Sequence, residues 1–265
     1  MLVSNLFLIT AALYATSCSL FLVHLARGTA RLARWAVRLL CAATAAHLGF
    51  ASLELYVSGL NPVADIHSSL ALLSLLIVCA FLLALLRYRI TVLGAFLTPL
   101  TLLFFLGAGL DRSVTEVPAN VRSALLPVHI GVNILGVVAF ALAAASATAY
   151  VLQERMLRQK RLGGLFERLP SLDVLDSLGF RLVLTGFPLL TVGLITGTIW
   201  VVQSESINLN ATQGFAVMAW LMFAAVLLLR IAVGWRGRRA AIGTILGFLC
   251  AMLVLAGYLL RSGGL

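Results

Sequence analysis

Long apolar runs separated by short polar stretches fill this sequence from one end to the other. A helix that crosses a bilayer needs roughly 20 predominantly apolar residues. Eight runs of about this length can be marked, at residues 3–25, 38–58, 67–86, 90–108, 125–152, 180–202, 212–232 and 240–260. The pattern therefore predicts an all-α protein with eight membrane-spanning helices.

The composition excludes a soluble protein of this size. Of the 265 residues, 62% are hydrophobic and only 11% are charged, and the mean hydropathy is +1.09. A soluble domain covers its surface with charged and polar side chains, and this chain has too few of them. No linker or low-complexity tract interrupts the runs, so we expect a polytopic membrane protein with one domain over residues 1–265.

The basic residues are unevenly distributed between the polar stretches. Every second stretch is rich in arginine, and together these stretches hold fourteen basic residues: Arg27, Arg31, Arg34, Arg38, Arg87, Arg89, Arg155, Arg158, Lys160, Arg161, Arg168, Arg236, Arg238 and Arg239. The remaining stretches hold three, Arg112, Arg122 and Arg261. Because basic loops are retained in the cytoplasm, this bias predicts that both termini face outward. The net charge of +10 then reflects topology, and we expect no nucleic-acid partner.

Residues 163–179 are too polar to span a membrane. Within them, leucines at positions 172, 175 and 178 have the spacing of an amphipathic helix. We predict a short helix over residues 171–179 that lies on the cytoplasmic surface. Ser171 stands where its side chain would cap the N-terminus of that helix.

Nothing in the sequence has the pattern of a catalytic or zinc site. Nucleophile-elbow, zinc-protease and phosphate-loop motifs are absent, and the four cysteines stand singly in apolar runs without CxxC spacing. The acidic residues are few and dispersed, and Asp173 and Asp176 are expected to pair with Arg181 or Arg168. We therefore expect that the protein is not an enzyme.

Histidines inside apolar runs are candidates for function, because an ionisable group is costly in hydrocarbon. His129 and His67 each stand near the outward start of a predicted span. A neutral imidazole is a common axial ligand of heme iron, and the two rings would approach one iron if these spans packed together. The alternative is that both are interfacial histidines that hydrogen-bond to loop carbonyls.

A further histidine and two tryptophans complete the candidate set. His47 lies deep in its span, and Glu54 follows seven residues later on the same helix face. His47 is either a second heme ligand or a buried imidazole bonded to a neighbouring helix. Trp200 and Trp220 flank an outward stretch, where they would line a porphyrin site or sit as interfacial aromatic residues.

Three segments resemble the transmembrane domain of the cytochrome c assembly family, the CcsA- and HemX-like proteins that handle heme in bacterial membranes. They are residues 125–158, with LPVHIGVN near the start, 170–200, and 220–260, with GWRGRR at 234–239. The resemblance implies a multi-pass protein of the bacterial inner membrane with heme as its cofactor. It also implies that His129 corresponds to a heme ligand on the outer face.

The chain departs from the family pattern around this outer site. The family's tryptophan-rich motif is expected near 205–213, where this chain reads ESINLNATQ. Many members carry a histidine shortly before GWRGRR, where this chain has Arg230. The second outer histidine of the full synthetases has no counterpart here. His67, which stands where the family more often has a tyrosine, is our candidate for a compensating ligand.

The leading hypothesis is a heme-handling membrane protein of cytochrome c assembly, with His129, His67 and His47 as candidate ligands and other assembly proteins as partners. The alternative is a HemX-like regulator or scaffold that controls a heme-biosynthetic enzyme, glutamyl-tRNA reductase, without bound heme. In that case the basic loop with Arg236, Arg238 and Arg239 would contact the partner. A small-molecule transporter is the third hypothesis, and no paired, interrupted helices support it.

Overall fold

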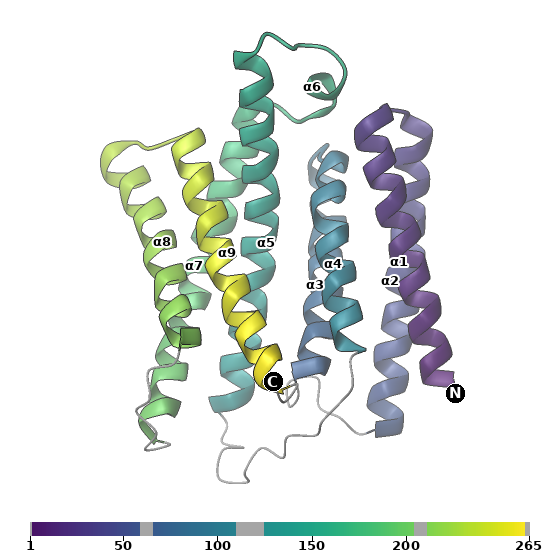
Figure 1. Cartoon of the computed structure of the whole chain (residues 1–265), viewed down its shortest axis with the longest axis vertical. Helices are drawn as coiled ribbons and strands as arrows, with labels where there is room; N and C mark the ends of the chain where they lie inside the picture. Colours follow the sequence, from purple (N-terminus) through teal and green to yellow (C-terminus); the bar gives the residue numbers. More distant parts are fainter. Residues whose placement is uncertain (1, 59–65, 110–124, 204–210, 263–265) are drawn as a thin grey trace. The chain divides into compact units, whose positions relative to one another are not determined.

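The protein is built from long α-helices, as the computed structural model shows for residues 2–58, 66–109, 125–203 and 211–262 (Figure 1). The elements are α1 (Leu2–Arg27), α2 (Ala30–Ser58), α3 (Ile66–Arg87), η1 (Thr91–Leu93), α4 (Gly94–Ala108), α5 (Leu125–Arg158), α6 (Leu165–Arg168), α7 (Leu172–Gln203), α8 (Ala211–Val233) and α9 (Arg238–Ser262). Within these ranges, eight helical segments are long and apolar enough to cross a membrane. The predicted all-α polytopic fold is confirmed. The outward orientation of the termini stays a prediction.

The helices form two compact units. The first, called unit 1 below, comprises Met1–Leu110 and Leu152–Val174, and unit 2 comprises Asp111–Val151 and Leu175–Leu265. Unit 1 therefore contains α1 to α4, and unit 2 contains most of α5 and α7 together with α8 and α9. The expectation of one domain over the whole chain stays a prediction.

An aromatic cluster fills the core of unit 1, where α1 packs against α2 and α4. The Phe105 ring of α4 stacks on Phe7 at 4.7 Å between centroids and meets the edges of Tyr14, His47 and Phe50 at 4.5 to 5.7 Å. Such edge contacts are favourable because the positive ring edge meets the negative ring face. The cluster places the imidazole of His47 among phenyl rings.

A glycine allows the turn between α1 and α2, and an arginine from α6 stabilises it. Gly28 has φ +74°, a left-handed conformation that favours glycine. Arg168 donates from Nη1 to the Leu25 carbonyl at 2.9 Å, and its guanidinium occupies the position that a Cβ of Gly28 would take. The contact satisfies a carbonyl at the end of α1, which would otherwise lack an intrahelical partner.

Two phenyl rings between two glycines form the centre of unit 2. Phe140 of α5 and Phe223 of α8 stack at 3.8 Å with an interplanar angle of 7°. A Cβ on Gly186 of α7 would lie 2.8 Å from the Phe140 ring, and one on Gly247 of α9 would lie 3.0 Å from Phe223. Small residues let helix backbones approach closely, so this stack connects all four helices of the unit.

The separate surface helix predicted over 171–179 is wrong. Residues 172–203 form one continuous helix, α7, so the amphipathic segment is its first two turns. A change from a polar to an apolar sequence does not by itself end a helix, because the backbone hydrogen bonds continue through it. The predicted cap is present: the Val174 amide donates to Ser171 Oγ at 3.4 Å.

The predicted partners of Asp176 are also wrong. Its carboxylate accepts two hydrogen bonds from Arg230 of α8, at 2.9 and 2.7 Å, rather than pairing with Arg168 or Arg181. The Gly237 amide donates to the same carboxylate at 3.2 Å. The ion pair therefore connects the start of α7 with the end of α8 and the turn before α9.

Candidate functional site

His129 lies one turn inside α5, where α5 faces α7. Its ring is half-buried, and Nδ1 lies 3.0 Å from Thr196 Oγ1 of α7. A Cβ on Gly197 would lie 2.9 Å from His129 Cε1. The absence of a side chain at Gly197 thus allows the imidazole to lie against the backbone of α7.

The hydrogen bonds of Thr196 indicate which nitrogen of His129 carries the proton. The single hydroxyl proton of Thr196 is directed to helix carbonyls, those of Val192 at 2.9 Å and Gly193 at 3.0 Å. The Thr196 oxygen is then an acceptor for the Nδ1–H of His129. This assignment leaves a lone pair on Nε2, which is the form of imidazole that ligates a metal.

Asn133 completes the polar group around His129. It lies one turn further along α5, and its Nδ2 donates to the His129 carbonyl at 2.7 Å. The same amide nitrogen lies 3.2 Å from His129 Nε2. A Cβ on Gly193 would overlap the Asn133 side chain, so a second glycine of α7 makes room for this group.

His67 is buried at the start of α3 in unit 1. Its exposed fraction is 4%, and its Nδ1 lies 3.2 Å from the Gly107 carbonyl near the end of α4. The partner is a carbonyl of a helix rather than of a loop. Whether Nε2 of His67 binds a ligand stays a prediction. His67 and His129 belong to different units, so their pairing on one iron stays a prediction.

His47 is fully buried in unit 1 and bonded to a neighbouring helix. Its Nδ1 lies 3.0 Å from the Tyr14 hydroxyl of α1, and its exposed fraction is 0%. This contact agrees with the predicted interhelical bond of a buried imidazole. Nε2 has no hydrogen-bond partner within the described parts of the chain, and the ring borders a pocket between α2 and α3.

The structure does not bring Trp220 against His129. The Trp220 indole donates to Thr191 Oγ1 at 3.0 Å and packs on Phe187. Thr191 and Thr196 are five residues apart on α7, so their side chains leave the helix about 140° apart. The side chain of Trp200 lies outside the described residues, as do Arg112, Arg122 and most of the stretch 205–213. A heme-lining role for the two tryptophans stays a prediction.

The basic residues predicted to contact a protein partner lie between α8 and α9 and on the first turn of α9. Arg236, Arg238 and Arg239 are all exposed, and the Arg239 guanidinium lies 5.7 Å from the Trp235 ring centroid. Their exposure makes them accessible, and their role as a contact surface stays a prediction.

Three residues of these sites did not stand out in the sequence. Asn133 has a signal, because it lies four residues after His129 and therefore on the same helix face. Thr196 and Tyr14 are 67 and 33 residues away from the histidines that they contact. Local spacing carries no signal for such pairs, which form only when the helices pack.

Comparison with known proteins identifies a family that matches nearly the whole chain. Residues 3–264 match the family model described as "Cytochrome C assembly protein". The chain is 30% identical over 228 residues to the "Cytochrome c biogenesis protein CcsA" of Prochlorococcus marinus subsp. pastoris, a match that covers 76% of this chain and 72% of the relative. It is 40% identical over 85 residues to the protein of the same name from Synechococcus sp., covering 31% of this chain and 24% of the relative.

Proposed function

This chain belongs to the cytochrome c assembly protein family, and from this premise we propose that it takes part in cytochrome c assembly by binding heme through His129. The observation that supports the proposal is the hydrogen bond between His129 Nδ1 and Thr196 Oγ1. It connects two helices of unit 2 and leaves on Nε2 the lone pair that a metal ion requires, with Asn133 as the present neighbour of this nitrogen.

The environment of His129 suits coordination of heme iron by its imidazole. Metal-binding histidines usually donate their other ring N–H to a protein acceptor, which sets the tautomer and the ring orientation. Thr196 supplies this acceptor, and Gly197 allows the ring to lie close to α7. Asn133, whose amide nitrogen lies 3.2 Å from Nε2, would move from this nitrogen when iron binds it.

The chemistry proposed for this site is binding and orientation. Heme, when bound, supplies the iron and the porphyrin that a c-type cytochrome requires. The protein holds the ring of His129 in place and provides a neutral nitrogen donor within an apolar helix bundle. We propose that the chain holds or passes heme and catalyses no reaction of its own.

We place this site at the outer side of the bacterial inner membrane. The proposal rests on the distribution of basic residues, which leaves the start of α5 on the side poor in arginine. Other cytochrome c assembly proteins are the proposed partners. The relatives are named as cytochrome c biogenesis proteins, and this favours the assembly role over the alternative of a regulator of heme biosynthesis.

A heme titration of the detergent-purified protein tests the proposal. We expect the wild-type protein to develop a Soret band with added hemin and His129→Ala to lose it, because the iron loses its nitrogen ligand. His24→Ala is the matched control. His24 is a buried histidine of unit 1 that hydrogen-bonds to the Thr29 carbonyl, and its replacement should leave the band unchanged.

Substitution of Thr196 tests the orienting hydrogen bond. We expect Thr196→Val, which keeps the shape and removes the oxygen, to weaken heme binding by about 10- to 100-fold. Thr196→Ser keeps the hydroxyl and should bind heme nearly as well as the wild-type protein. A wild-type protein without a Soret band, or a band that persists in His129→Ala, would show that the proposed site is wrong.

A further inference from the structure

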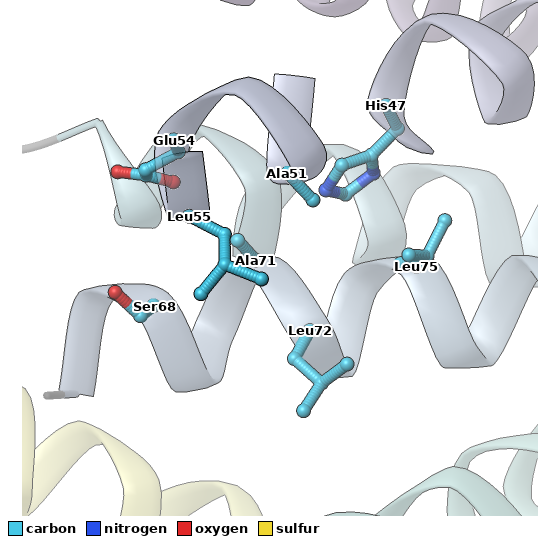
Figure 2. Close-up of a pocket in the computed structure, with 8 residues that line it drawn as sticks. All are labelled: His47, Ala51, Glu54, Leu55, Ser68, Ala71, Leu72 and Leu75. Carbon is cyan, nitrogen blue, oxygen red and sulfur yellow. The ribbon is translucent and has the colours of Figure 1, made fainter. Parts of the chain in front are cut away.

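A second polar site lies in unit 1, in a pocket between α2 and α3. Its volume is about 60 Å³, and it is lined by His47, Ala51, Glu54, Leu55, Ser68, Ala71, Leu72 and Leu75. Figure 2 shows His47 and Leu75 at one end and Glu54 and Ser68 at the other, with apolar side chains between them. The pocket thus has a polar group at each end of an apolar middle.

The His47 ring has an unmet hydrogen-bonding requirement at this pocket. Its exposed fraction is 0%, its Nδ1 is bonded to Tyr14, and its Nε2 has no hydrogen-bond partner among the described residues. A buried polar atom without a partner is destabilising. A group that enters the pocket and hydrogen-bonds Nε2 would remove this cost.

The dimensions of the pocket indicate which group fits. One water molecule needs roughly 10–15 Å³ of this kind of space together with two or more polar partners. A pocket of about 60 Å³ with an imidazole, a carboxyl group and a hydroxyl group meets both conditions. It holds a few water molecules and is far too small to enclose a porphyrin.

We propose that this pocket binds water that links His47 Nε2 to Glu54, so that the buried imidazole exchanges protons through the end of unit 1 where α2 ends. Glu54 lies seven residues beyond His47, so their Cα atoms are roughly 10 Å apart along the helix, and a short chain of water molecules links the two side chains. Chains of glutamate, histidine and water transfer protons inside membrane proteins in this way. Glu54 is buried, with an exposed fraction of 7%. It forms the end of the proposed proton path that lies away from His47.

Among the described residues, other titratable groups lie near the two ends of this path. Tyr14 of α1 contacts Nδ1 of His47, and Cys79 of α3 lies near Tyr14. His67 of α3 is bonded to the Gly107 carbonyl of α4, and residues 94–108 of α4 contain no titratable side chain. Glu54 is the carboxyl group that lines the pocket, and the proposed water connects it to His47.

Water-edited solid-state NMR of the full-length protein in lipid bilayers tests this proposal. With ¹⁵N-labelled histidine, and with the His47 signals assigned from their loss in His47→Gln, we expect magnetisation to pass from water to the His47 ring. Ala51→Val adds two carbon atoms at the pocket and should abolish this transfer. Ser52→Ala changes an exposed hydroxyl on the same helix and should leave it intact.

Proton exchange at His47 gives a second readout. We expect Glu54→Gln to keep water in the pocket and to slow exchange at the His47 ring at least tenfold, because the amide does not take up and release protons. Wild-type protein without transfer from water to His47 would overturn the proposal, as would an exchange rate unchanged by Glu54→Gln. Both measurements are made without heme and do not depend on His129, so their failure is distinguishable from a failure of the heme proposal.

Discussion

Replacing Asp176 by alanine is expected to lower the free energy of unfolding by about 3 kcal/mol. The side chains of Asp176 and Arg230 are only 16% and 12% exposed, and they meet through two hydrogen bonds. The Arg230 guanidinium also lies 4.2 Å from the Phe180 ring centroid. Removing the carboxylate leaves this guanidinium largely buried without its counter-ion and removes the acceptor of the Gly237 amide. Unfolding by SDS in mixed micelles, followed by circular dichroism, measures the loss.

A double variant separates the cost of an unpaired charge from the value of the pair. We expect Asp176→Leu combined with Arg230→Met to recover most of the stability lost in Asp176→Ala, because replacing both partners of a buried ion pair leaves no unpaired charge. If the double variant is as unstable as the sum of its single substitutions, the unpaired charge is not the cause.

The Glu154–Arg158 pair provides the matched control. It joins two residues four apart on α5, at 2.8 Å, and the Arg158 side chain is 68% exposed. Solvent screens such pairs, so Arg158→Ala should change the free energy of unfolding by less than about 0.5 kcal/mol. A similar loss in both variants would mean that the burial of the Asp176–Arg230 pair is not what matters.

Gly186→Ala is expected to destabilise the protein by about 1–3 kcal/mol, the usual cost of overfilling a packed core. The new Cβ would lie 2.8 Å from Cε1 of Phe140, which is 1% exposed and stacks on Phe223 at 3.8 Å. A Cβ on Gly247 would likewise lie 3.0 Å from the Phe223 ring. Because Phe140 is buried and contacts both Gly186 and Phe223, the new methyl group requires the ring or the helices α5 and α7 to shift. The same mixed-micelle unfolding assay detects the effect.

Two comparisons test the physical cause of this effect. Gly131→Ala on α5, where a Cβ meets no atom within 4 Å, should be neutral or slightly stabilising, since alanine favours a helix over glycine. In a Phe140→Ala background, Gly186→Ala should cost much less than in the wild-type protein, because the ring that it would strike is gone. Equal losses in both backgrounds would count against a steric cause.

The predicted spans illustrate how strongly a bilayer constrains a sequence. In hydrocarbon each backbone N–H and C=O group must be satisfied inside the chain, so an apolar run of about 20 residues has few alternatives to a helix. All eight spans were predictable for this reason. The ends of the helices were less so: α2 begins at Ala30, in the arginine-rich stretch, and α7 begins at Leu172. Arginine favours a helix about as strongly as leucine does. A change in hydropathy therefore does not mark the residue at which a helix starts.

The candidate histidines were likewise predictable from the sequence in one respect and not in another. Their type and their place in the spans marked them as costly groups, and this singled out His47, His67 and His129. What each ring contacts depends on the packing of distant segments. Asp176 illustrates the difficulty. Its partner is Arg230, 54 residues away, and not one of the basic residues that are nearest to it in the sequence.

The sequence by itself determined the class of the protein, its eight spans and the histidines that are candidates for function, because these depend on composition and local spacing. Only the tertiary structure decided that Thr196 orients His129, that Tyr14 holds His47, and that the second nitrogen of His47 borders a pocket. Each of these pairs joins separate helices. The physical reason is that a hydrogen bond or an unfilled volume between helices depends on how their surfaces pack, and the spacing of residues along one helix does not encode this.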